Sequence, residues 1–206
     1  MPHRVLANHV GLSSHTRIAR PLAEHIAAWE WAALIFMGVA AAAVSTLVDL
    51  HLRIPGHAIL KSLFPMAAGF AVVPRRGAGM VMAGSALVTA IGLRMFGQIG
   101  GGFGLGAMSS MVALGLLLDW ALRRTKSGWG VYRAFIIAGL ASNLIALGTR
   151  GGAKWFGWEK LGSRPFGMWI GQAAITYTLC GILAGFISAL IWFSLKDREP
   201  KRVEEQ

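Results

Sequence analysis

Apolar segments separated by short polar turns follow one another along most of the sequence. Six of them cover roughly residues 28–50, 57–73, 77–96, 103–122, 130–149 and 168–194. Most are about 20 residues long, the length of helix that crosses the hydrocarbon core of a bilayer. The pattern predicts an all-α integral membrane protein, a six-transmembrane-helix bundle formed by residues 28–194 as one domain.

The second segment is the least regular of the six. It is short, it contains Lys61 and Pro65, and only the turn at residues 73–76 separates it from the next segment. Because a proline removes a helical hydrogen bond and a short span fits the bilayer poorly, we expect a tilted or broken helix here.

The polar segments at the two ends set the topology. Residues 1–27 form a basic N-terminal segment and residues 195–206 a charged tail, and the apolar run at 28–50 is longer than the apolar core of a secretory signal. Counting alternate connections of six spans, thirteen of the 20 Lys and Arg residues lie on the side of both termini and seven on the other. Cytoplasmic loops are enriched in these residues, so we expect both termini in the cytoplasm of a multi-pass protein of the plasma or inner membrane.

Composition agrees with this class. The chain is 55% hydrophobic and 14% charged, against about 25% charged residues in soluble domains. Its net charge of +11 is interpreted as membrane topology and attraction to anionic lipid, and no nucleic-acid partner is expected. The single cysteine, Cys180, excludes an internal disulfide and a cysteine-ligated metal site.

Catalytic and nucleotide-binding motifs are missing from the sequence. It contains no Walker motif, no HExxH and no nucleophile elbow. The Gly-rich stretch at residues 97–106 lacks the Lys-Ser/Thr pair of a phosphate-binding loop, and a flexible or re-entrant loop fits it better. We therefore expect a protein that is not an enzyme and that does not pump by its own ATP hydrolysis.

The densest polar cluster on the predicted outer side surrounds a Pro-Gly turn at residues 49–57. Asp49, His51 and His57 can bind a divalent metal, whereas Arg53 with Lys61 can hold an anionic ligand, so two opposite ligand charges stay open. Capping and snorkelling at the membrane interface is the plainer interpretation.

Other residues allow a structural and a functional interpretation. Trp155 and Trp158 suit an aromatic belt or a lid over a ligand. Asp119 and Arg123 have the spacing of an ordinary ion pair on one helix. Small residues suit helix packing within the bundle or docking of a partner membrane subunit: Gly38, Ala42, Gly181 and Gly185.

Three short motifs carry a resemblance to a known family. They are Ile54-Pro-Gly-His57, Pro74-Arg-Arg-Gly-Ala-Gly79, and the Gly-rich stretch followed by Ala107-Met-Ser-Ser110. Together they resemble the substrate-binding S-component of energy-coupling factor transporters, closest to the cobalt and nickel branch. The likeness covers about a third of the chain, residues 49–122. Members of the metal branch begin with Met-His, whereas this chain begins Met1-Pro2-His3.

The resemblance implies a membrane-embedded binding subunit that takes up a vitamin or a transition metal. It implies that a coupling transmembrane protein docks on the first helix and that separate ATPase subunits supply the energy. By position it makes His57 the first ligand candidate, with His51 and Arg94 or Gln98 secondary; His57 and His51 would then hold a divalent transition metal. The alternative from the residues alone is a structural or accessory helical subunit of a larger membrane complex.

Overall fold

The computed structural model is an all-helical bundle. It describes residues 27–48, 56–96, 104–125, 129–158 and 166–194, which contain six helices. Five of them, all except α3, are long and apolar enough to cross a membrane, consistent with a multi-pass membrane protein. The helices are α2 (Ala28–Leu47), α3 (Ala58–Val72), α4 (Ala78–Met95), α5 (Leu105–Arg123), α6 (Trp129–Trp155) and α7 (Phe166–Ser194).

The largest difference from the predicted boundaries is at the end of α6. The apolar run ends near residue 149, but the helix continues to Trp155. Gly151, Ala153 and Lys154 in this extension are buried. Burial of one face therefore sustains the helix beyond the point where its sequence becomes polar.

Helix α3 is the short member of the bundle. Its 15 residues rise about 22 Å, less than the roughly 30 Å of a hydrocarbon core, so a sixth span stays a prediction. The helix runs through Pro65 without a break, so the break considered from the sequence is absent. Eleven of its 15 residues are buried, because α3 packs against all five of the other helices.

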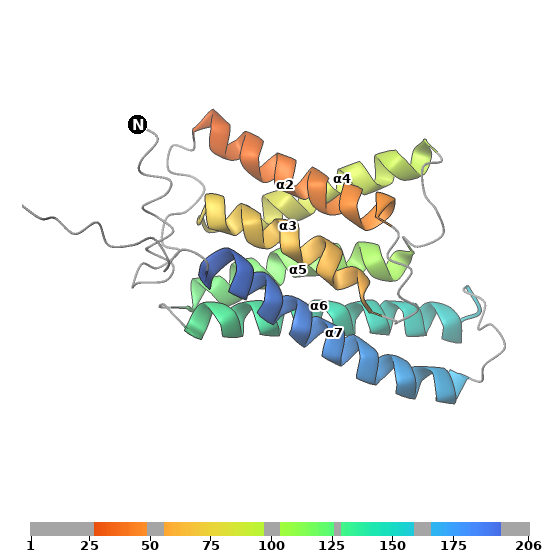
Figure 1. Cartoon of the computed structure of the whole chain (residues 1–206). Coiled ribbons are helices and arrows are strands. Elements are labelled where there is room, and N and C mark those ends of the chain that lie inside the picture. Colours follow the sequence, from red (N-terminus) through yellow and green to blue (C-terminus); the bar gives the residue numbers. More distant parts are fainter. Residues whose placement is uncertain (1–26, 49–55, 97–103, 126–128, 159–165, 195–206) are drawn as a thin grey trace, which may run out of the picture.

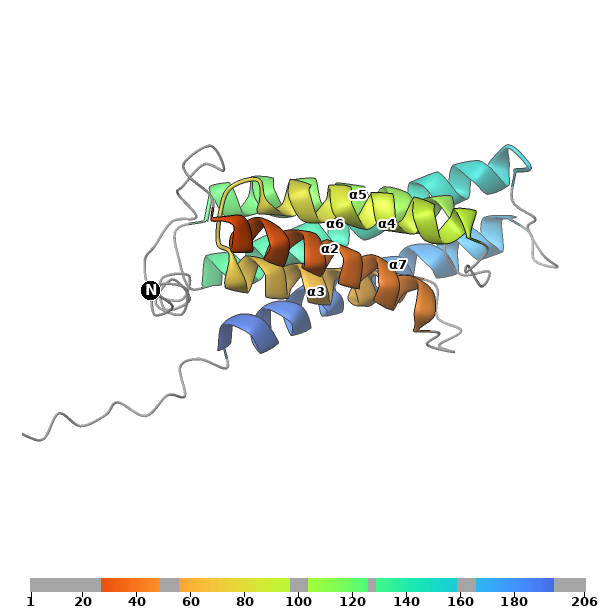
Figure 2. The ribbon, with the colours of Figure 1, turned by 90° about the horizontal axis from the view of Figure 1, so that it is seen from above.

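Successive helices run in opposite directions, so the bundle has two ends (Figures 1 and 2). We call the end where α3, α5 and α7 begin the His57 end. The other is the Arg75 end, where α2 begins and α7 finishes. The predicted terminal segments, 1–27 and 195–206, lie outside the described residues except for Ala27.

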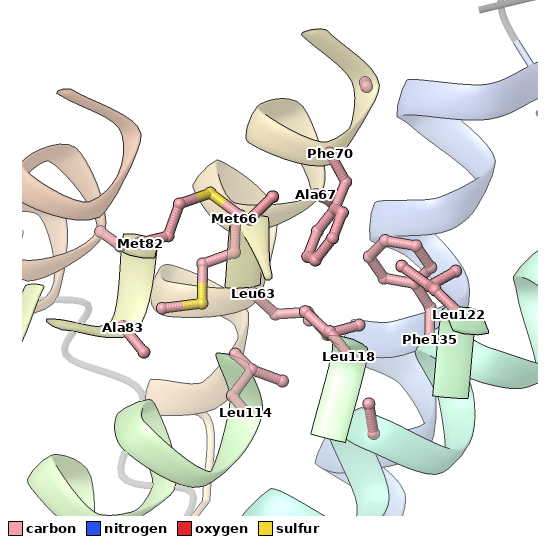
Figure 3. Close-up of a cluster of buried hydrophobic side chains, with 14 of the residues drawn as sticks. Leu63, Met66, Ala67, Phe70, Met82, Ala83, Leu114, Leu118, Leu122 and Phe135 are labelled. Atoms are coloured by element: carbon pink, nitrogen blue, oxygen red, sulfur yellow. The ribbon is translucent and has the colours of Figure 1, made fainter. Parts of the chain in front are cut away.

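Large side chains of α3 fill the centre of the bundle. Leu63, Met66 and Phe70 are fully buried there. Figure 3 shows them between side chains of α4, α5 and α6. Phe70 meets Phe135 of α6 edge to face, with ring centroids 6.4 Å apart. The short helix thus lies at the centre of the hydrophobic core.

The outward surface is apolar as well. Ile175, Leu179 and Leu183 follow one another at four-residue spacing on α7 and are 54–64% exposed. Val88 of α4 is 71% exposed. Apolar side chains that cover the outside of an apolar core are typical of helices that face lipid.

Glycines bring the outer helices into backbone contact. A Cβ on Gly139 of α6 would lie 2.6 Å from the carbonyl oxygen of Gly181 on α7, and one on Gly185 would meet the backbone of Phe135. A Cβ on Gly38 of α2 would meet Ser85 and the Met82 backbone of α4.

All four small residues noted in the sequence are buried within the chain: Gly38, Ala42, Gly181 and Gly185. Gly38 of α2 packs directly against α4.

Carboxylates hold the Arg75 end together. Glu30 of α2 forms a bidentate ion pair with Arg75, whose guanidinium nitrogen lies 2.9 Å from a carboxylate oxygen. Asp119 of α5 is buried and accepts three backbone hydrogen bonds, from Gly77 at 2.8 Å, Gly79 at 3.2 Å and Met80 at 2.8 Å.

Asp119 therefore caps the N-terminus of a neighbouring helix. Both of its oxygens accept from the first turn of α4, so the interpretation of Asp119 and Arg123 as a simple ion pair missed its main partners. Such a carboxylate satisfies backbone donors that the helix itself leaves unpaired, and it complements the helix dipole.

Two glycines of α6 make a matched test of the close helix contacts. Gly139→Ala should lower the free energy of unfolding, by about 1–3 kcal/mol, because the new methyl group collides with the α7 backbone. Gly148→Ala should leave it unchanged or raise it by up to about 1 kcal/mol, because no atom lies within 4 Å of a Cβ there and Ala is the better helix former. Denaturant unfolding in a mild detergent measures both; equal effects would contradict backbone contact at Gly139.

Removing the carboxylate cap should destabilise the protein. Asp119→Ala leaves three backbone N–H groups without their acceptor, two of them buried, and we expect a loss of about 1–3 kcal/mol or more in the free energy of unfolding. Arg123→Gln is the control: Arg123 is exposed, so its loss should change stability by less than about 0.5 kcal/mol. Equal losses in the two variants, measured under the same conditions, would favour the ion pair over the cap.

Candidate functional site

The sequence-predicted site residues that the structure describes lie at the His57 end. His57 precedes the first residue of α3, and Arg94 is in the last turn of α4. Trp155 ends α6, and Trp158 follows it. The other three candidates are outside the described residues: His51, Arg53 and Gln98.

A turn at Gly56 and His57 leads into α3. Gly56 has a φ of 89°, a left-handed conformation that favours glycine. A Cβ on Gly56 would also lie 3.0 Å from the Cα of Tyr177. The chain therefore passes close to the α7 backbone as α3 begins, and His57 is held half-buried at the start of the helix.

Asn143 of α6 fixes this turn. Its side-chain amide donates to the carbonyl oxygen of Gly56 at 3.3 Å and to that of Tyr177 at 2.7 Å. The side chain is 2% exposed. One amide therefore joins the entry to α3 with both α6 and α7.

These bonds place the start of α3 well inside the bundle. Twelve residues separate Asn143 from the end of α6, a rise of about 18 Å. Helix α3 thus begins about halfway along α6, and the last turns of α6 and the first turns of α7 continue beyond it (Figure 1).

The side chains beyond the start of α3 include further donors and cations. Arg150 donates to the hydroxyl of buried Tyr177 at 3.4 Å. Thr149 and Ser109 share a hydrogen bond of 2.9 Å between α6 and α5. A Cβ on Gly106 would lie 3.5 Å from the Cβ of Arg150, so the start of α5 also packs here.

Two lysines of this end are buried. Lys61, in the first turn of α3, is 9% exposed and donates to the backbone carbonyl of Val48 at the end of α2. Lys154 is 8% exposed, and its ammonium lies 5.0 Å from the ring centroid of Trp169. Such cations are expensive to place in an apolar protein and are typical of functional sites in membranes.

The aromatic and basic candidates at the rim are exposed. Trp155 packs on Phe166 with ring centroids 5.4 Å apart, and Trp158 lies 6.1 Å from Phe156. Both tryptophans are at least 70% exposed, and Arg94 is exposed as well. They lie at the same end of the bundle as His57 but at its surface. This position is compatible with both interpretations of the tryptophans, an aromatic belt and a lid over a ligand.

The metal interpretation of His57 and His51 stays a prediction. Among the residues that the structure describes, no three His, Cys, Asp or Glu side chains are grouped so that they could hold a metal ion. His51 and Asp49, the proposed partners of His57, are outside that part of the chain.

Asn143 is the site residue that sequence analysis missed. The available signal was a lone amide within the apolar run at 130–149, since a side-chain amide at that depth requires hydrogen-bond partners.

Comparison of the chain with family models, with curated proteins and with solved structures finds no match. The arrangement itself has ammonium, guanidinium and hydroxyl groups at one end of an apolar bundle. That is the chemistry of ligand recognition.

The role of Asn143 can be tested by a nearly isosteric change. Asn143→Ala removes the donor, and we expect it to lower the free energy of unfolding by about 1–2 kcal/mol. Asn143→Asp should lower it further, because it also places carboxylate oxygens against two carbonyl oxygens. Hydrogen exchange in the first turn of α3, measured with unfolding in detergent, should rise in both variants. A harmless Asn143→Asp would show that the amide does not hold this turn.

Proposed function

We propose that the protein is a membrane-embedded substrate-binding subunit of an uptake transporter for a vitamin or a transition metal. It resembles the S-components of energy-coupling factor transporters and has six spans with both termini in the cytoplasm. The His57 end faces outward and receives the ligand. A separate ATPase module and a coupling membrane protein supply the energy.

The observation that carries this proposal is the position of His57. A half-buried imidazole lies at the start of a helix that begins about halfway along its neighbours, where Asn143 holds the entry turn. The surface of the bundle is otherwise apolar along α7 and α4. Polar donors gathered beyond a recessed helix start support a ligand site more than a lipid-facing surface.

His57 has the central role in this site, with His51 and Arg53 of the preceding segment as further ligand contacts. Arg94 and Gln98 would approach from the connection between α4 and α5. Trp155 and Trp158 would cover the ligand from the end of α6.

The coupling partner would dock away from Gly38 and Ala42. Gly38 is covered by α4 and Ala42 is buried, while Trp29 and Phe36 are exposed on the opposite side of α2. The same apolar exposure supports the alternative function, an accessory helical subunit of a larger membrane complex.

Replacing His57 tests the site directly. His57→Ala should lose the bound ligand, while Arg133→Ala at the Arg75 end, where the side chain is exposed, should retain it. Native mass spectrometry of gently extracted protein, with metal analysis of the same sample, measures retention. Unfolding midpoints show whether each variant is folded.

Two results would contradict the assignment. Unchanged ligand retention in folded His57→Ala would remove His57 from the site. A wild-type protein that carries no small molecule or metal but stays in a large stable assembly would instead support the accessory subunit.

A further inference from the structure

Among the described residues, basic side chains lie at both ends of the bundle, but acidic side chains lie at only one. Both carboxylates in the described part of the chain, Glu30 and Asp119, belong to the Arg75 end, where Arg75 and the backbone of α4 engage them. The described charged side chains of the His57 end are all basic: Lys61, Arg94, Arg150 and Lys154.

Lys61 is the member of this set with the least compensation. It is nine-tenths buried, and its described hydrogen bond goes to the neutral carbonyl of Val48. An ammonium has three N–H donors, so a single carbonyl leaves two of them to be satisfied. A buried cation is stabilised chiefly by an opposite charge, which no described residue of this end provides.

Helix dipoles do not distinguish the two ends of the bundle. Helices α3, α5 and α7 begin at the His57 end, but α2, α4 and α6 finish there, so helix termini of both signs lie at this end. The positive charge of the described residues of this end therefore comes from its side chains.

We propose that the ligand of the His57 end is an anion, a molecule with a carboxylate or phosphate group, and that Lys61 is its counter-ion. This inference rests on the proposed function and names its substrate class. A divalent metal ion bound beside Lys61 would be repelled by the buried ammonium, whereas an anion neutralises it.

Two variants of Lys61, one without the positive charge and one with it, test the proposal in the full chain. Lys61→Met keeps an unbranched side chain and removes the charge, whereas Lys61→Arg keeps it. Arg133→Met removes one charge from the Arg75 end and serves as the control. Each protein is extracted in mild detergent, its bound molecule is released by denaturation, and the released molecule is identified in negative- and positive-ion mass spectrometry alongside metal analysis.

The anion released from the wild type is then the probe for calorimetric titration into washed, folded protein. We expect Lys61→Met to raise its dissociation constant about 10- to 100-fold, as loss of a charge-assisted hydrogen bond does. Lys61→Arg should bind within a few-fold of the wild type, and Arg133→Met should be unchanged. Unfolding midpoints identify any variant that fails to fold. If Lys61→Met does not fold, the affinity of Lys61→Arg for the anion tests the proposal.

The outcomes separate this inference from the proposed function. A metal ion or an uncharged molecule released from the wild type would overturn the anion and leave the uptake subunit standing. An anion bound equally well by folded Lys61→Met, or lost from folded Lys61→Arg, would overturn the role of Lys61. If the released anion is a phospholipid that is lost in Lys61→Met, the anion site stands and the uptake function is overturned. A wild-type protein without any bound molecule would overturn both the anion site and the uptake function.

Discussion

The hydrogen bonds from Asn143 to Gly56 and Tyr177 determine the depth at which α3 begins, and the rest of the bundle is arranged around that depth. In an apolar environment every backbone polar group needs a partner within the protein. Backbone carbonyls that lie inside the bundle must find donors on neighbouring elements. The amide of Asn143 donates to Gly56 and Tyr177 and the ammonium of Lys61 to Val48, and both place polar chemistry in the interior.

The outer helices pack closely against one another although the hydrophobic effect contributes little to helix association in lipid. Lipid tails are as apolar as leucine, so helix association in a membrane relies on packing. Gly139 with Gly181, and Gly79 with Gly115, allow backbone contact between paired helices. The central α3 instead packs through large side chains such as Phe70. Helix α3 therefore packs among helices that are themselves in close backbone contact.

The sequence predicts the number and approximate positions of the six helices, because each helix coincides with an apolar run. It does not predict the depth of α3, which depends on bonds between residues 87 positions apart. Asp119 shows the same limit: its four-residue spacing to Arg123 suggests a local ion pair, while its backbone partners lie 39–42 positions away. The place of His57 at a helix start is predictable from its Pro-Gly turn. The partners of Asn143 are not, because Gly56 and Tyr177 become its neighbours only in the folded chain.

The cations of the His57 end need an explanation other than topology. In the proposed orientation this end faces outward, and the positive-inside rule accounts for an excess of Lys and Arg on the opposite side. Lys61 and Lys154 are also too buried to act as snorkelling anchors for lipid headgroups. Asp119 shows that this chain can supply its own carboxylate where a helix start needs a permanent one. An anion that comes from outside can also leave, which is the property that an uptake subunit requires of its ligand.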